Sequence, residues 1–299
     1  MTTPEVSIIV AVRQAPFTIR TTLASLSAQC KDLDAEVIAL VSADDSTRNV
    51  LKDFTAPGVR VIIQPPARGV PQLRRDGVLV SRAPYFVITE DHCTFPDGWL
   101  KRLLNELRDK GAVAAGGPVL NGRRTFSGWA QYFTRYAAFM LPVANGATRY
   151  LPGNNAIYAR ASIESYLPLI EDGFWEAEFN HALLADKHAF WMNPDLAIEQ
   201  HQHRGAFAYL PLRFRHGRCY GGRRFRAATS RERWRLLAAT PLIPLILYWR
   251  AARNVIRKRR HMGIFLITTP LQMCYFGAWA AGETAGYVFG QGTFWWDTD

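Results

Sequence analysis

An alternation of apolar runs and helix-like segments along the first third of the chain constrains the fold more than any other feature. The apolar runs have the length and the β-branched content of buried strands, and they cover residues 6–12, 35–41, 59–63 and 85–88. Segments in which apolar residues recur at helical spacing separate them, at residues 18–29, 49–54 and 72–81. Because strands and helices that alternate with short polar joints form parallel sheets, we expect an α/β fold.

Shorter elements follow in the middle of the chain. We expect a helix from Trp99 to about residue 110, a strand at 113–117, a helix at about 177–187 and a strand within 190–200. Residues 118–150 are irregular and rich in aromatic side chains, which fits a helix over a cleft and equally a packed surface helix.

The composition and the cysteine spacing indicate a globular protein in a reducing compartment. Hydrophobic residues make up 48% and aromatic residues 12% of the 299 positions, which argues against disorder. The four cysteines, Cys30, Cys93, Cys219 and Cys274, lie far apart and lack C-x-x-C spacing. We therefore expect neither a disulfide framework nor a zinc knuckle.

Charge is distributed unevenly along the chain. The 36 Lys and Arg and 25 Asp and Glu give a net charge of +11. Residues 204–260 hold 16 of the basic residues and one acid, Glu232, so this segment carries +15 and the remainder −4. Because a solvated surface usually mixes signs, this asymmetry favours a polyanionic partner or an anionic membrane surface.

Two apolar segments flank the basic residues 250–261. The second, 262–281, is a run of 20 residues without a charge, about the length that spans a bilayer. Pro270 within it predicts a kink, or a re-entrant or interfacial position. We expect a C-terminal apolar helical hairpin within residues 231–299 that contacts the membrane, either spanning it or lying on it, with two buried core helices as the alternative. The positive-inside rule places the basic segment on the cytoplasmic face of the inner membrane.

Three ionisable residues end the fourth apolar run. Glu90, Asp91 and His92 follow residues 85–88 after Thr89, at the carboxyl end of an expected strand, where open α/β sheets bind ligands. Burial of these side chains is costly unless something compensates it, and carboxylates and imidazoles are usual ligands of divalent cations. We predict a metal site at these three residues, and a solvated acidic loop is the alternative.

Several motifs, in this order along the chain, resemble those of family 2 glycosyltransferases with the GT-A fold. Residues 7–13 are similar to the first strand and loop of that family, and residues 68–77 to its later Arg-Gly and Arg-Asn motif, with Asp76 in place of Asn. Pro96 and Trp99 follow the acidic cluster as in the family. The resemblance covers about residues 5–203. It implies a Rossmann-like mixed sheet flanked by helices, with a nucleotide-binding half at about 1–117 and an acceptor half at about 118–230.

The resemblance also implies which residues bind the donor and the metal. Donor-binding candidates are Ala11, Val12, Arg13, Asp44, Asp45, Arg68, Arg75, Glu90 and Asp91. Asp44 or Asp45 is expected to accept hydrogen bonds from the nucleobase or ribose, and capping of a turn is the alternative. The metal, Mn²⁺ or Mg²⁺, is expected to bind to Asp91, His92 and Glu90 and to bridge the donor diphosphate.

A carboxylate before the helix at 177–187 stands where the family has its catalytic base. The family alignment puts this role on Glu176, which would deprotonate the acceptor hydroxyl. Capping of the helix N-terminus is the alternative function of this residue. Further candidates for the site are Glu178, His201, His203 and Arg218.

From these features we expect an inverting glycosyltransferase at the membrane. Its donor would be a nucleotide sugar, with UDP favoured, and its acceptor a hydroxyl of a lipid-linked molecule or of a cell-envelope glycan. A polyprenyl-phosphate sugar transferase is one alternative, because an acceptor phosphate needs no strong base. A catalytically inactive, basic membrane-binding protein is another. Nucleic acid is not an expected partner, since the basic segment leads into apolar helices and lacks nucleic-acid-binding motifs.

Overall fold

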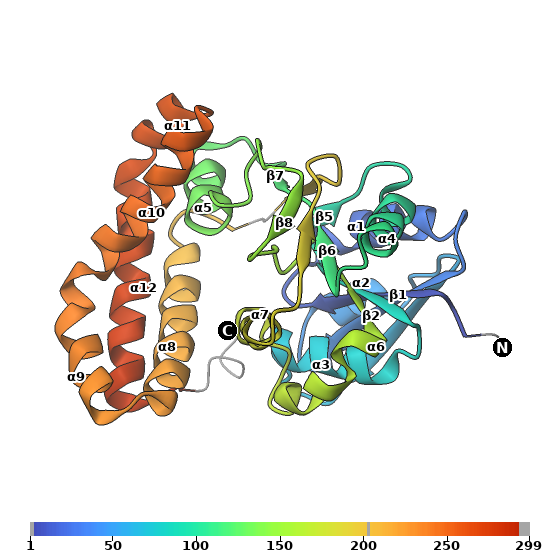
Figure 1. Ribbon diagram of the computed structural model, residues 1–299, viewed down its shortest axis with the longest axis horizontal. Coiled ribbons are helices and arrows are strands. Elements are labelled where there is room, and N and C mark those ends of the chain that lie inside the picture. Colours follow the sequence, from blue (N-terminus) through green and yellow to red (C-terminus); the bar gives the residue numbers. More distant parts are fainter. Residues whose placement is uncertain (1–2, 202–203, 293–299) are drawn as a thin grey trace. The chain divides into compact units, whose positions relative to one another are not determined.

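The computed structural model describes residues 3–201 and 204–292, which fall into two units (Figure 1). The first unit contains residues 1–122 and 139–202, and the second residues 123–138 and 203–299. The first unit carries every β-strand of the described chain, and the second consists of helices. The predicted division at residue 230 stays a prediction, and the helices at 126–136 and 209–227 belong to the second unit.

An eight-stranded mixed sheet forms the centre of the first unit. Its strands are β1 (Val6–Val12), β2 (Ala35–Ser42), β3 (Val59–Gln64), β4 (Tyr85–Glu90), β6 (Ala114–Gly116), β8 (Gly146–Thr148), β9 (Ala156–Ala159) and β10 (Phe190–Met192). They lie in the order β3-β2-β1-β4-β9-β6-β10-β8. The first four are parallel, whereas β9 runs antiparallel to both β4 and β6. Every side chain of β1 is buried, as a continuous apolar run requires.

Helices cover the sheet and connect its strands. They are α1 (Ile19–Gln29), α2 (Thr47–Leu51), α3 (Val70–Val80), α4 (Trp99–Lys110), α6 (Arg160–Ile163), the 3₁₀ helix η1 (Glu164–Ile170) and α7 (Glu176–Ala185). In α4, Leu100, Leu103, Leu104 and Leu107 form one buried face. The helix ends at Gly111, whose φ of 56° is readily adopted by glycine.

The strand predicted within residues 190–200 is two strands in the structure. The segment forms β10 and then β11 (Ile198–Gln200), which belongs to a separate three-stranded sheet with β5 (Cys93–Thr94) and β7 (Val119–Asn121). Between the two strands, the Asn193 side chain accepts a hydrogen bond of 2.9 Å from the backbone N–H of Asp195, and Pro194 has no N–H to offer. This turn directs the chain from one sheet into the other.

The register of β1 and β4 determines where the polar residues lie. Ala11 is paired with Glu90 across the two parallel strands. The residues that follow, Arg13 and Asp91, therefore leave the sheet next to each other at its carboxyl edge. This edge carries the acidic cluster.

The second unit consists of α5 (Phe126–Tyr136), α8 (Tyr209–Ala227), α9 (Ser230–Ala239), the 3₁₀ helix η2 (Thr240–Leu242), α10 (Ile243–Lys258), α11 (Met262–Ile267) and α12 (Thr269–Phe289). Helices α8 and α12 lie side by side (Figure 1). A Cβ added at Gly217 would come within 3.0 Å of the backbone nitrogen of Glu283, and one at Gly282 within 2.7 Å of the carbonyl carbon of Phe214. Glycine at these positions therefore lets the two backbones touch.

The apolar run at 262–281 is not one helix. It divides at Thr268 into α11 and α12, and Pro270 stands in the first turn of α12, where its missing N–H costs nothing. Helix α10 packs on α12, with α11 between them in sequence. Within residues 3–201 and 204–292, no helix combines the length and the apolar character needed to cross a membrane.

Candidate functional site

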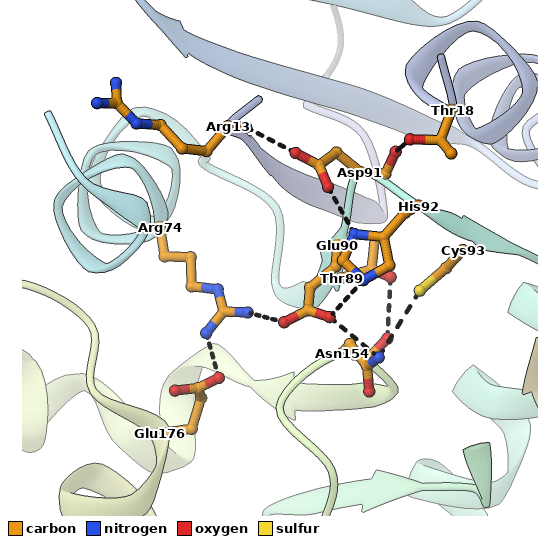
Figure 2. A network of polar contacts seen from close by, with 10 residues as sticks. All are labelled: Arg13, Thr18, Arg74, Thr89, Glu90, Asp91, His92, Cys93, Asn154 and Glu176. Carbon is orange, nitrogen blue, oxygen red and sulfur yellow. Dashed lines mark hydrogen bonds and ion pairs between the residues drawn. The ribbon is translucent and has the colours of Figure 1, made fainter. Parts of the chain in front are cut away.

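Asp91 links the ends of β1 and β4 at the carboxyl edge of the sheet (Figure 2). Its Oδ2 accepts a hydrogen bond of 2.6 Å from the backbone N–H of Arg13, and its backbone carbonyl accepts one of 2.9 Å from the Thr18 hydroxyl. Its second oxygen, Oδ1, lies 2.7 Å from Nδ1 of His92. The Asp91 side chain is almost fully buried, and each of its oxygens faces a donor.

The His92 ring stands between two carboxylates. Its Nε2 lies 3.2 Å from Oε2 of Glu90, and its Nδ1 faces Asp91. Burial by itself lowers the pKa of His92, but hydrogen bonds to Asp91 and Glu90 and the charges of both raise it to about 9. The two carboxylates therefore favour the protonated form of His92, whose charge offsets part of the acidic cluster.

Arg74 connects the acidic cluster to Glu176. Its Nη2 lies 3.3 Å from Oε1 of Glu90, and its Nη1 forms an ion pair with Oε1 of Glu176. The Arg74 side chain is only 4% exposed. Glu176 opens α7 and lies against Gly153, where a Cβ would collide with its carboxylate. Residues far apart in sequence thus bring the predicted base to the predicted metal cluster (Figure 2).

The neighbouring Arg75 has different partners. Its Nε and Nη2 donate to Oδ1 of Asp76 at 2.8 and 2.6 Å, and its Nη1 donates to the carbonyl of Glu171 at 2.7 Å. The guanidinium within the cluster is therefore that of Arg74, which was absent from the predicted site residues although it lies in the same motif. A role of Arg75 in donor binding stays a prediction.

Asn154 is a second residue of the cluster that the sequence did not single out. Its Nδ2 lies 3.3 Å from Oε2 of Glu90 and 3.7 Å from the Cys93 sulfur, and its carbonyl accepts a hydrogen bond of 2.9 Å from Thr89. The residue is 1% exposed. A polar residue in the loop before β9 carries no local signal of such a position.

The two acids of the loop after β2 have different surroundings. Asp45 is buried, and its two oxygens accept hydrogen bonds of 2.8 Å from the backbone N–H groups of Gln14 and Thr47. Asp44 is exposed and pairs with Arg13 at 3.5 Å. Burial alone raises the pKa of Asp44, but the hydrogen bond from Ser42, backbone hydrogen bonds and the charge of Arg13 lower it below its usual value. The fold therefore uses Asp45 to hold its loops, and Asp44 faces solvent.

The remaining candidates lie in several places. The side chains of Ala11 and Val12 are buried in β1, so only their backbone is available to a ligand. The backbone N–H of Arg68 donates to the Ser42 hydroxyl at 3.2 Å, beside the Asp44 loop. Glu178 is exposed in the first turn of α7.

The histidines and Arg218 complete the set of predicted residues. His201 donates its backbone N–H to the carbonyl of His92 at 2.7 Å, and its Nε2 lies 2.9 Å from the Thr94 hydroxyl. It therefore adjoins the acidic cluster through β5. Arg218 belongs to the second unit, where its Nε donates to the carbonyl of Gly290 at 3.3 Å. His203 lies outside the described residues.

The carboxylate and imidazole groups of the cluster are of the kinds that bind a divalent cation, but they are not arranged around a common metal position in this structure. Carboxylate oxygens are the ligands preferred by Mg²⁺ and Mn²⁺, and imidazole also suits Mn²⁺. Across the described part of the chain, however, no three His, Cys, Asp or Glu side chains are arranged to hold a metal ion. Asp91 Oδ1 and Glu90 Oε2 both face the His92 ring, which occupies the space between them.

Comparison with known proteins finds one matching family model and many similar solved structures. The family model described as glycosyl transferase family 2 matches residues 7–167, more than half of the chain. Among solved structures, the mannosyltransferase PcManGT from Pyrobaculum calidifontis, in complex with GDP-Man and Mn²⁺, is similar with a TM-score of 0.56 and 16% identity. That match covers 97% of this chain and 88% of the other, and it confirms the expected GT-A-like mixed sheet flanked by helices. No curated protein matches the sequence.

Proposed function

Because the chain belongs to glycosyl transferase family 2, we propose that it is an inverting enzyme that moves a sugar from a nucleotide-sugar donor to an acceptor hydroxyl at a membrane. The observation that carries this proposal is the bridge formed by Arg74, which holds Glu176 next to Glu90 at the carboxyl edge of the sheet. In the proposed reaction Glu176 is the base, and the acidic cluster holds the diphosphate through a bound cation.

The donor nucleotide is proposed to bind between the loops after β1 and β2. Asp44 is the better candidate for the nucleobase or ribose, because both oxygens of Asp45 already accept backbone N–H groups. Arg13 and Arg68 lie beside the same loop and are proposed to face the diphosphate. UDP is the favoured nucleotide, and GDP belongs in the same trial because the similar mannosyltransferase was solved with GDP-Man.

A divalent cation is the proposed cofactor, held by Glu90 and Asp91, where it would neutralise negative charge on the leaving diphosphate. The chain itself already brings two cations to this place, since His92 lies between these carboxylates and Arg74 contacts Glu90. The Arg74 guanidinium is proposed to remain beside Glu90 when the donor binds and to fix the distance from Glu90 to Glu176.

Glu176 is the proposed catalytic base. As the acceptor oxygen attacks the anomeric carbon, the hydroxyl proton passes to a carboxylate oxygen of Glu176 and the nucleoside diphosphate leaves with the electron pair of the broken bond. About one quarter of the Glu176 side chain is solvent-accessible, so an acceptor can reach it. Inversion at the anomeric carbon is proposed from the family resemblance.

A lipid-linked or cell-envelope acceptor, on the cytoplasmic face of the inner membrane, is proposed from the second unit. Leu242, Leu245, Ile246 and Trp249 recur at helical spacing along η2 and α10, and all are exposed. Exposed arginines, among them Arg250, follow in the next turns of α10. An apolar stripe with adjacent basic residues is typical of helices that lie in the interface of an anionic membrane.

The test is turnover of a panel of UDP- and GDP-sugars with Mn²⁺ or Mg²⁺ and membrane extract as acceptor. We expect one donor to release its nucleoside diphosphate, and Glu176→Gln to lower the rate by about 10²–10⁴-fold. A rate that Glu176→Gln leaves unchanged would favour transfer to a polyprenyl phosphate, whose oxygen carries no proton to remove. If no donor turns over in the natural protein, the proposal of an active enzyme is wrong.

A further inference from the structure

Three helices of the second unit each contribute two side chains, one turn apart, to the surroundings of Arg213. These pairs are Gln131 and Arg135 on α5, Tyr209 and Arg213 on α8, and Tyr275 and Trp279 on α12. The rings of Tyr209 and Tyr275 meet edge to face with centroids 4.7 Å apart. The guanidinium of Arg213 lies 4.4 Å from the centre of the Trp279 ring.

Arg213 is a buried cation without an acidic partner. Arg213 is only 6% exposed, and no carboxylate among the described residues pairs with its guanidinium. The buried acid of this unit, Glu283, has other partners: it accepts from Trp279 Nε1 at 2.8 Å, pairs with Arg224 at 3.5 Å and bonds the Tyr287 hydroxyl. Among the residues that the structure describes, no carboxylate therefore balances the charge of Arg213.

Two buried atoms of this group that can donate lack a hydrogen-bond partner within the described residues, and so does one buried acceptor, Oε1 of Gln131. Nε of Arg213 and the hydroxyl of Tyr209 are both buried and make no hydrogen bond of normal geometry. The positive charge of Arg135 also acts on Arg213. Burial of an unpaired guanidinium is strongly unfavourable, and contact with aromatic faces offsets only part of that cost.

We propose that Arg213, Arg135 and Tyr209 form a binding site for a phosphate group. A phosphate oxygen accepts from guanidinium and hydroxyl donors at once, and a phosphate dianion supplies the missing negative charge. The group would come either from free phosphate or from the phosphomonoester of a lipid. The site lies within the second unit, and the inference does not depend on glycosyl transfer.

Thermal unfolding of the full chain in increasing inorganic phosphate, at ionic strength held constant with NaCl, tests the site. We expect Tm to rise and saturate for the natural protein, and Arg213→Met to weaken phosphate binding by about tenfold or more, the usual effect of losing a charge-assisted contact. Arg226→Met is the matched control, because Arg226 is an exposed arginine of the same helix. Its phosphate response should equal that of the natural protein.

Vesicle binding distinguishes the two sources. Phosphatidylcholine vesicles that contain phosphatidic acid should bind the natural protein at least about tenfold more tightly than Arg213→Met if the ligand is a lipid phosphomonoester. Equal vesicle binding with a lost response to inorganic phosphate identifies free phosphate. If neither response depends on Arg213, the residue is held by the aromatic rings alone and the proposal is wrong.

Arg135→Gln provides a second variant from outside the buried core. Arg135 is half-buried near the end of α5, so its replacement should leave the helices intact. We expect it to weaken phosphate binding in the same assay. Unchanged phosphate affinity in Arg135→Gln, together with an Arg213→Met protein that does not fold, would also refute the site.

Discussion

Gly153→Ala should displace the proposed base while leaving the fold intact. A Cβ at this position would lie 2.7 Å from Cδ and 3.0 Å from Cγ of Glu176, whereas ordinary contact begins at 3.4 Å. The carboxyl carbon must therefore retreat by about 0.7 Å, and the oxygen that binds Arg74 by more. The atoms in the way belong to the end of a flexible side chain, and the φ of Gly153 lies outside the left-handed region. The free energy of unfolding should consequently change by less than about 1 kcal/mol.

The same displacement should be costly for the reaction. A misplacement of about 1 Å in a reacting group lowers the rate by about 10²-fold, so we expect kcat to fall by about 10- to 100-fold. KM for the donor should change little, because the substitution does not touch the loops after β1 and β2, where the nucleotide is proposed to bind. Initial rates with the donor identified by the nucleotide-sugar panel, together with urea unfolding, measure both quantities.

The double variant Gly153→Ala/Glu176→Gln separates this explanation from a general effect on the site. If the glycine acts only through the base, the double variant should be about as slow as Glu176→Gln alone. A further fall of the same size when Gly153→Ala is added to the Glu176→Gln enzyme would refute the reasoning. So would a Gly153→Ala enzyme with the natural kcat.

Separate parts of the structure support three further predictions. Asp45→Asn should lower the free energy of unfolding, measured in urea, by about 1–2 kcal/mol, because Asp45 accepts hydrogen bonds from two backbone N–H groups. Asp44→Asn should instead raise KM for the donor and leave the free energy of unfolding unchanged. Burial, together with the charge of Glu36, raises the pKa of Cys30 to about 11. At pH 8 the thiolate fraction of Cys30 should therefore be about 100-fold below that of an ordinary thiol. Iodoacetamide labelling followed by mass spectrometry should show correspondingly slow alkylation. Trp249→Ser should weaken sedimentation with phosphatidylglycerol vesicles by about tenfold, and Tyr150→Ser, which removes an exposed aromatic ring from the first unit, should not.

The four parallel strands were predictable because each reads as a largely unbroken apolar run. The shorter strands were not predictable. β10 and β11 have three residues each, which is too few to show the alternation of buried and exposed side chains that identifies a strand. Pro270 could have indicated that the apolar run 262–281 divides into two helices, because proline is compatible with the first turn of a helix but not with its interior. A count of uncharged residues alone misses such a boundary.

The acidic cluster was predictable from local sequence, because Glu90, Asp91 and His92 are neighbours in the chain. Its wider surroundings were not. Glu176 reaches Arg74 across 102 positions, and Asn154 reaches Glu90 across 64. These contacts form because β9 inserts between β4 and β6 in the folded sheet, and because Glu176 at the start of α7 reaches Arg74 on α3.

The helical spacing of α3 could have indicated that Arg74, and not Arg75, reaches the acidic cluster. Leu73, Gly77 and Val78 are buried on α3, and Arg74 shares their face because 74 is separated from 77 and 78 by three and four residues. Arg75 lies about 100° further around the helix and reaches Asp76 and the Glu171 carbonyl instead. A charged residue on the buried face of an amphipathic helix must find a partner, and Glu90 and Glu176 are the partners that Arg74 finds. Its position on the buried face of α3 thus marks Arg74, rather than Arg75, as the residue that joins the acidic cluster to the proposed base.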